Sequence, residues 1–419
     1  MTIALGSGVF YGWRVVGAAF VLAALGWGIG FYGPPVYLQA IGENRGWPVA
    51  LISTAVTTHF VIGAVVVANL PTLYLRFGVP IATRTGAILL AVGVLGWACA
   101  TTPWVLFVAT LLGGAGWAAM GAAAVKAIVS PWFVRTRPLA LSMAYNGASI
   151  GGAVFSPLWV TAIGVLGFPI AAAAIGVVTI STIWVLADLL FSRAPQEMGL
   201  RPDGDAVGIM AASGGSPAAG LRCAPTLWGD LKFLTLSVGM ALGLFAQIGL
   251  IAHLFSLLVP ALGPQPAGLA MGLATASAIA GRTLVGWVMP ADADRRVVAC
   301  ASYAVQIAGS VVFILAAGTS VPLLLLGVVL FGAGIGNATS LPPLIAQVEF
   351  PKDHVPRVVA LTIAVAQAAY AFAPASFGLI REFAPSAAGA ASSAAPGVFV
   401  AAACAQGLAI CAFLLGRNR

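Results

Sequence analysis

Charged residues are scarce in this sequence. They make up 7% of its 419 residues, and acidic residues number only 11, whereas a soluble domain carries about 25% charged residues. There are only three histidines and five cysteines. Because these few residues are scattered, they assemble no metal site, disulfide framework or nucleophile–base pair. The sequence therefore excludes a soluble fold and predicts neither an enzyme nor a bound metal or cofactor.

Long apolar runs fill most of the chain. Hydrophobic residues make up 61% of it, and the mean hydropathy is +1.04. The runs have the length that helices need to cross a bilayer core of about 30 Å, and the alternating ten-residue segments of a membrane barrel are not seen. The sequence thus predicts an all-α integral membrane protein with twelve spans. The expected spans are 14–41, 48–70, 82–100, 104–130, 138–166, 168–191, 230–262, 266–289, 297–318, 321–350, 356–381 and 395–415.

Basic residues gather in the loops on one side of these spans. Only Arg45 and Arg381 fall in loops on the other side. The positive-inside rule therefore places both termini and the middle loop in the cytoplasm, with the chain in the inner membrane of the cell. The net charge of +8 follows from this asymmetry, and nucleic-acid binding is not expected. The first span lacks a cleavage site, so it is not a signal peptide.

The chain divides into two similar halves. Residues 192–229 are rich in Gly, Ser and Pro, a composition typical of a flexible linker. It separates six spans in residues 1–191 from six in residues 230–419. Arg76 and Arg295 correspond at an offset of 219 positions, and RPLALS at 137–142 is followed 220 positions later by RVVALT. Such repeated halves are typical of secondary transporters, which bind substrate near the midplane.

Two basic residues lie inside spans. Arg282, in GRTLVGW, is eight residues from Pro290, or roughly 12 Å along a helix, too deep for its side chain to reach the interface. We expect it to bind an anion in a central cavity, because a guanidinium grips a carboxylate with two parallel hydrogen bonds. The alternative is a structural arginine that donates to helix-end carbonyls. Lys126 is only roughly 7.5 Å from Pro131, so it either snorkels or contacts substrate.

Several neutral polar residues also lie within spans. His59 and His253 are near the midplane, where they are expected either to contact substrate and carry protons or to donate to helix carbonyls. For Tyr32, Asn146 and Gln247 we weigh lining the pathway against hydrogen bonding between helices. The carboxylates sit at helix ends rather than at mid-span. Proton symport, exchange and facilitated diffusion are therefore all compatible with the sequence.

Six plus six helices, a long middle loop and basic loops after the second and eighth spans resemble the major facilitator superfamily. The family's loop signature combines glycines, an acid and basic residues. The first loop keeps Arg76, Gly78 and Arg84 but has Leu75 at the acidic position. The second loop keeps Gly286, Asp294, Arg295 and Arg296. The resemblance implies that these loops control the change of conformation and that the protein is a monomer.

Shorter stretches resemble the monocarboxylate and oxalate/formate exchanger branch of that family. They are YGWRVVGAAF (11–20), SPWFVRTRPLALSMAYNGASIGG (130–152), MGLRPDG (198–204) and GRTLVGW (281–287). The resemblance implies that Arg282 binds a substrate carboxylate. Oxalate-binding relatives add a lysine on the eleventh helix, where this chain has Gln367 and Tyr370. One fixed cation with neutral partners fits a monocarboxylate better than a dicarboxylate.

We therefore expect an alternating-access transporter of a small organic anion, foremost a monocarboxylate, coupled to a proton, to a counter-anion or to neither. Uptake or export of a larger organic anion or metal chelate is the nearest alternative. A membrane sensor would bind ligand without flux, and a channel does not explain the repeated halves. Small-residue patterns such as Gly147-x-x-x-Gly151 and GAGIGN (332–337) are expected to pack helices closely.

Overall fold

The computed structural model describes residues 10–204, 227–290, 292–383 and 395–417. Within these ranges every regular element is helical, and twelve segments are long and apolar enough to cross a membrane. The all-α membrane fold is therefore confirmed. The main helices are α1 (Tyr11–Gly30), α2 (Pro34–Arg45), α3 (Val49–Phe77), α4 (Val79–Cys99), α5 (Pro103–Ala119), α6 (Ala122–Val129), α7 (Arg137–Leu166), α8 (Phe168–Leu186), α9 (Leu231–Leu262), α10 (Pro264–Val288), α11 (Arg295–Ala316), α12 (Val321–Glu349), α13 (Val355–Ala371), α14 (Ala373–Phe383) and α15 (Pro396–Leu415).

Three of the predicted spans are each two helices. The span 14–41 breaks between α1 and α2, the span 104–130 between α5 and α6, and the span 356–381 between α13 and α14. Proline explains two of these breaks, because it lacks an N–H and favours the first turn of a new helix. Pro34 begins α2, and Pro374 stands in the first turn of α14. Hydropathy alone could not show these interruptions, since the residues on both sides remain apolar.

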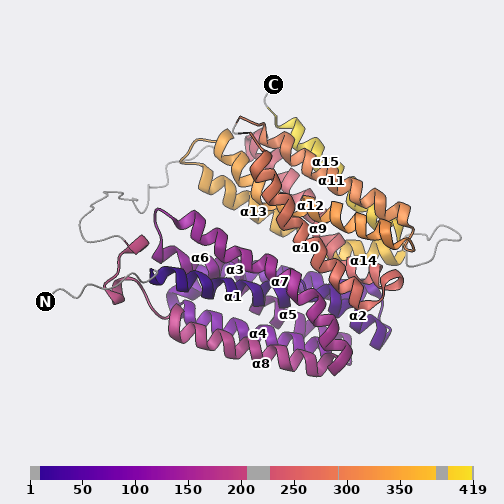
Figure 1. Ribbon diagram of the computed structural model, residues 1–419, viewed down its shortest axis with the longest axis horizontal. Helices are drawn as coiled ribbons and strands as arrows, with labels where there is room; N and C mark the ends of the chain where they lie inside the picture. The colour runs from indigo at the N-terminus through magenta and orange to yellow at the C-terminus, as the bar shows by residue number, and fades with distance from the viewer. Residues whose placement is uncertain (1–9, 205–226, 291, 384–394, 418–419) are drawn as a thin grey trace.

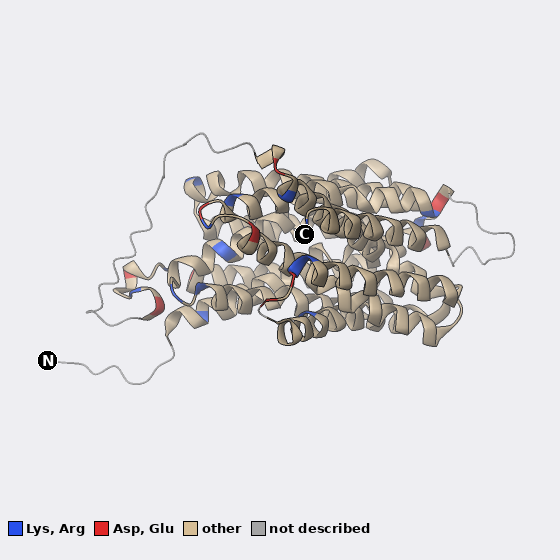
Figure 2. Ribbon diagram, turned by 90° about the horizontal axis from the view of Figure 1, so that it is seen from above, with Lys and Arg blue, Asp and Glu red and all other residues tan. Residues whose placement is uncertain are grey.

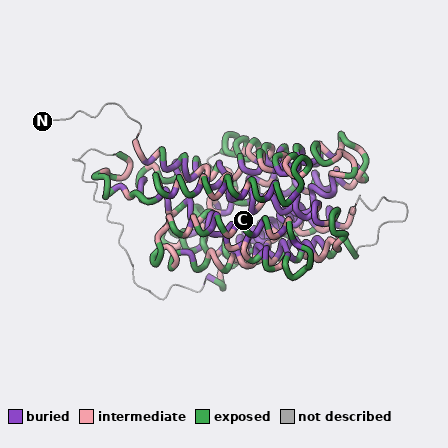
Figure 3. The backbone as a smooth tube through the Cα atoms, turned by 90° about the horizontal axis from the view of Figure 1, so that it is seen from below, coloured by how far each residue is buried: buried purple, intermediate pink, exposed green. Residues whose placement is uncertain are grey.

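The helices form two bundles, α1–α8 and α9–α15 (Figure 1). We call the end where α1 and α9 begin and α15 ends the termini side, and the opposite end, with the connection between α2 and α3, the far side. Figure 1 shows that the bundles meet at the far side, near α2 and α14, and diverge toward the termini side. Buried residues lie toward the middle of the molecule, while exposed residues line its outer edges (Figure 3). Those exposed faces are apolar, as Trp104 (81% exposed) and Trp287 (84%) illustrate, which suits contact with lipid.

Glycines allow several helices to approach backbone to backbone. A Cβ at Gly147 would lie 2.1 Å from the carbonyl oxygen of Phe20, and one at Gly151 would lie 2.4 Å from that of Ala24. Any side chain at these two positions would therefore push α7 away from α1. The expected role of the Gly147-x-x-x-Gly151 pattern in helix packing is confirmed.

Charged groups lie toward the helix ends (Figure 2). At the termini side Arg84 pairs with Asp188, and the buried Arg296 pairs with Glu349 through Nε and Oε1 at 2.6 Å. Asp230 accepts from the backbone N–H of Lys232 and caps α9. The carboxylates at the ends of spans are thus structural, as the sequence indicated.

The beginning of the predicted linker is not free. Asp203 Oδ2 accepts hydrogen bonds from the backbone N–H groups of Val134 and Arg135 at 2.9 and 2.8 Å, and Oδ1 accepts from the hydroxyl of Thr136 at 2.6 Å. The segment Pro202–Gly204 therefore docks on the loop before α7, which corrects the expectation of a flexible linker at that point. The stretch 205–226 of that linker lies outside the described residues.

We expect the Asp203→Ala variant to be cut by trypsin after Arg135 roughly five to ten times faster than wild type, since the loop 134–136 loses several hydrogen bonds to an ionised acceptor. Glu197→Ala is the matched control, because Glu197 accepts only from the nearby backbone N–H of Ala194. Equal cleavage rates for the two variants would contradict the docking role of Asp203.

The same contact predicts a dependence on pH. Burial acts to raise the pKa of Asp203, but the hydrogen bonds from Thr136, Arg135 and Val134 outweigh it and lower the pKa to about 2. The folded pKa lies below the ordinary value, so the stabilisation is complete above about pH 4 and is lost as the pH falls toward 2. Protection of the backbone N–H groups of Val134 and Arg135 against hydrogen exchange, corrected for the intrinsic exchange rate, should therefore be unchanged between pH 7 and pH 5 and should weaken only below that range.

Candidate functional site

Two seams join the bundles at the far side. The first runs between α7 and α10, where a Cβ at Gly268 would lie 3.2 Å from Cα of Pro157 and one at Gly272 would lie 2.9 Å from the carbonyl oxygen of Ala153. Nearby, Tyr32 of the first bundle lies beside Thr275 of α10. These close approaches fix α10 against α7 and α1 over the far half of its length.

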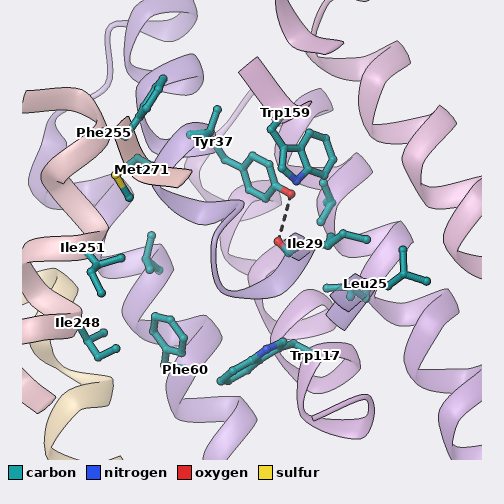
Figure 4. Close-up of a cluster of buried hydrophobic side chains, with 14 of the residues drawn as sticks. Leu25, Ile29, Tyr37, Phe60, Trp117, Trp159, Ile248, Ile251, Phe255 and Met271 are labelled. Atoms are coloured by element: carbon teal, nitrogen blue, oxygen red, sulfur yellow. Dashed lines mark hydrogen bonds between the residues drawn. The ribbon is translucent and has the colours of Figure 1, made fainter. Parts of the chain in front are cut away.

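The second seam runs between α3 and the pair α13 and α14. The hydroxyl of Thr57 accepts from the backbone N–H of Ala375 at 3.0 Å. The rings of Phe60 and Tyr370 meet edge to face, with centroids 6.1 Å apart. Phe31, Phe60, Ile248 and Ile251 line only a small void of about 10 Å³. The far side is closed by apolar packing, part of which Figure 4 shows.

Beyond these seams the facing surfaces of the bundles are exposed. Asn146 lies seven residues before Ala153 and Arg282 seven residues after Thr275, so each continues the inward face of its helix toward the termini by roughly 10 Å. Both side chains are exposed. Arg282 is also near enough to Tyr32 for an electrostatic interaction. Arg282 therefore lies on the side of α10 that faces the first bundle, in the region where the bundles diverge toward the termini side (Figure 1).

Two further candidates lie on helices of the same region. Gln367 lies one turn of α13 beyond Tyr370, and its side chain is partly exposed. Lys126 is exposed on α6, one turn past Ala122, whose carbonyl accepts from the hydroxyl of Tyr145 on α7 at 3.0 Å. We call the region where the bundles diverge the termini-side opening, and the residues assigned to it are Asn146, Arg282, Gln367 and Lys126. Among the described residues neither of its two cations has an acidic partner.

The orientation of Arg282 is set by α12. Its Nε donates to the carbonyl oxygen of Gly336 at 3.1 Å. That approach requires a glycine, since a Cβ at Gly336 would lie 2.3 Å from the carbonyl oxygen of Ala278 and 3.1 Å from Cβ of Arg282. With Nε occupied, the two terminal nitrogens are left to grip a carboxylate end-on. The expected packing role of GAGIGN is confirmed here.

Three of the expected site residues lie elsewhere. His59 is 3% exposed and stacks on Trp117 inside the first bundle, with ring centroids 5.7 Å apart. His253 is fully buried, and its Nε2 lies 3.1 Å from the carbonyl oxygen of Pro374, so it connects α9 to α14. Gln247 is 1% exposed and donates to Gln306 at 2.9 Å. In this conformation all three serve packing, and none faces the termini-side opening.

The residue that Gln247 meets was not predicted from the sequence. Gln306 Oε1 accepts from both Gln247 and Gln406, the latter at 3.1 Å, and this buried network links α9, α11 and α15. Single glutamines in separate spans carry no signal that they will meet. The opening thus keeps two cations and neutral polar groups, while the histidines and glutamines of the interior hold helices together.

The fold and these facing surfaces can now be set beside known proteins. A family model described as Major Facilitator Superfamily matches residues 6–374. The chain belongs to the major facilitator superfamily. Membership makes it a transporter rather than an enzyme. No curated protein matches the sequence.

Solved structures of superfamily transporters share the architecture. The nucleoside transporter NupG is 12% identical with a TM-score of 0.72, over 98% of this chain and 100% of that one. A bacterial homologue of the human lysosomal transporter Spinster, in an inward-facing and occupied conformation, is 13% identical with a TM-score of 0.69, over 98% and 97% of the two chains. At such identities the likeness shows the fold alone.

The two superfamily loop motifs differ in how they are held. In the second motif, Asp294 caps α11 by accepting from the backbone N–H of Arg296 at 3.0 Å, and it also pairs with Arg417 at 2.5 Å. Its neighbour Arg295 donates to the carbonyl oxygen of Leu344 at 2.7 Å. Gly286 is exposed with open space around it.

The first superfamily motif lacks such a carboxylate. Leu75 is 90% exposed at the acidic position, and the guanidinium of Arg76 lies over the ring of Phe77. Gly78 has a φ of +80°, a conformation that disfavours other residues, and it separates α3 from α4. Arg84 finds its partner instead in Asp188. The ionic anchoring is therefore stronger in the second bundle.

Proposed function

We propose that this transporter carries a small organic anion, foremost a monocarboxylate, which binds in the termini-side opening. The observation that carries the proposal is Arg282, an exposed guanidinium inside a span that faces the other bundle. A cation in such a place is costly in the absence of a counter-charge. The described residues provide no acidic partner, so the substrate supplies it.

The neutral surroundings of Arg282 favour a single negative charge. Gln367 and Tyr370 offer hydrogen bonds, and α13 has no second cation after Arg357 in its first turn. Asn146 and Tyr32 are the corresponding neutral partners from the first bundle. A carboxylate held by Arg282 would leave the rest of the substrate to contact these groups.

We further propose that residues 1–191 and 230–419 act as two rocking units that work by alternating access. The closed far side and the exposed termini-side opening correspond to one end state. Under the positive-inside rule the opening faces the cytoplasm of a cell whose inner membrane holds the protein, so this state is inward-facing. The burial of His59 and His253 favours exchange or facilitated diffusion over proton symport through a histidine.

A larger organic anion is the second candidate, and Lys126 is the observation that favours it. Its ammonium is exposed on α6 of the first bundle and offers a second cation to a second anionic group. Counterflow in liposomes loaded with labelled mono- and dicarboxylates tests both candidates. Exchange of monocarboxylates alone supports the main proposal, exchange of bulkier polyanions supports the second, and the absence of any anion flux contradicts both.

The Gln367→Lys variant is expected to shift the preference toward dicarboxylates. It adds a second cation to the proposed site, because residue 367 lies on α13 one turn from Tyr370. We expect the ratio of dicarboxylate to monocarboxylate uptake to rise roughly tenfold, since one charge-assisted hydrogen bond contributes about 1.5 kcal/mol. Gln367→Met is the control of similar size. An unchanged ratio would place the substrate away from α13.

A further inference from the structure

The far-side seam between α3 and α14 contains an unusual exchange of hydrogen bonds. At the start of α3, the backbone N–H of Ala50 belongs to the first turn and has no partner within its own helix. Glu382 lies near the end of α14, 332 positions later in the chain, and it accepts from this N–H through Oε2 at 2.8 Å. A carboxylate at a helix N-terminus also interacts favourably with the helix dipole. The second bundle thus caps a helix of the first.

The reverse contact is made two turns away along both helices. The break at Phe372 starts a new helix, so the backbone N–H of Ala375 in the first turn of α14 is also without an internal partner. Thr57 of α3 accepts from it through its hydroxyl at 3.0 Å. Each of the two helices therefore satisfies an orphan donor at the start of the other.

Between these contacts the helices touch closely, and α14 is tied to its own bundle. A Cβ at Gly378 would lie 2.5 Å from Oγ of Ser53. Arg381 donates to Ser256 of α9, and His253 of α9 meets the carbonyl of Pro374. Since α14 cannot shift independently of α9, parting the bundles at the far side would break both caps together.

We propose that this reciprocal capping by Thr57 and Glu382 is the latch that keeps the far side closed. Opening the far side replaces both caps by hydrogen bonds to water, whereas closing it restores them, so the pair favours the conformation seen here. The latch rests on the proposed function only for its orientation, with the far side outside the cell. Its action requires no particular substrate.

Accessibility of the closed plug tests the latch directly. A single cysteine at Ile251, in a background where the five native cysteines are replaced by serine, reports opening through its reaction with a membrane-impermeant thiol reagent. The reagent is applied to the far side of vesicles, and a second reporter at Trp47 establishes which side that is. Loss of a helix cap shifts such an equilibrium by roughly 5-fold. We therefore expect Thr57→Val and Glu382→Ala each to raise the labelling rate about 5-fold.

Matched variants separate the latch from a general loss of structure. Thr57→Ser and Glu382→Gln keep an acceptor oxygen and should label close to the wild-type rate. Glu43→Ala removes an exposed far-side carboxylate that meets only Gln39 within α2, and it should also leave labelling unchanged. Wild-type labelling in both Thr57→Val and Glu382→Ala would overturn the latch. Equal acceleration by Thr57→Ser would overturn it as well, since that variant retains the acceptor.

The result is independent of the proposed substrate. If labelling responds as expected while no anion is transported, the latch stands and the anion proposal fails. If anions are transported while the capping variants label like wild type, only the latch fails.

Discussion

Replacing Arg282 with glutamine is expected to abolish measurable anion binding. The neutral side chain cannot form charge-assisted hydrogen bonds to a carboxylate, and two such bonds contribute about 3 kcal/mol, which corresponds to roughly a 100-fold loss of affinity. Thermal stabilisation of the purified protein by a panel of monocarboxylates measures this effect. Arg282→Lys should retain part of the affinity, because it keeps the charge but loses the planar pair of donors.

Lys126→Gln is the control for the loss of one positive charge. It removes an exposed cation from α6 of the first bundle, and we expect less than about a 3-fold effect on a monocarboxylate, since screening is strong at exposed sites. A comparable loss in both variants would indicate general electrostatic attraction rather than a specific site. Stabilisation of Arg282→Gln equal to that of wild type would return Arg282 to a structural role on α12.

The Glu349→Gln variant is expected to lose more stability than any other single charge removal at the termini side. Arg296 is 1% exposed, and Glu349 holds its guanidinium through two contacts, Nε to Oε1 at 2.6 Å and Nη2 to Oε2 at 2.8 Å. Removal of the carboxylate leaves a buried charge without its counter-charge, although Thr235, Phe413 and Lys232 still accept from it, and this costs about 3–5 kcal/mol. Thermal unfolding in detergent, followed with and without ligand, should show a large fall in the melting temperature.

Arg417→Gln provides the matched comparison. It breaks the pair with Asp294, in which the side chains are 49% and 35% exposed, so the expected loss is below about 1 kcal/mol. Similar melting temperatures for Glu349→Gln and Arg417→Gln would mean that Arg296 is hydrated when its partner is removed. The difference between the two variants therefore measures the contribution of burial.

Composition was enough to predict the spans, because a segment that crosses a bilayer must be apolar over its whole length. The depth of Arg282 followed from the same reasoning, since Pro290 marks the end of its helix. Contacts between distant residues could not be predicted in this way. His253 gave the same signal as a substrate-binding histidine, and only its distance to the carbonyl of Pro374 separates the two roles.

The helix breaks and the docked linker were missed for a related reason. Hydropathy is unchanged across Phe372, so the sequence indicated one span where α13 and α14 form two. Asp203 lies in a polar stretch that is typical of a linker, but its carboxylate finds three backbone donors in another loop. In both cases backbone hydrogen bonding decided the structure, and backbone groups leave little trace in side-chain composition.

The hydrogen bond from Arg282 to Gly336 also bears on how such a transporter could acquire new substrates. It fixes the charged anchor to the second bundle, so a bound anion would travel with that bundle while the first bundle moves past it. Substitutions at Tyr32 or Asn146 could then alter which molecules are accepted without disturbing the anchor. Selection could thus vary one wall of the opening while the other preserves the requirement for an anion.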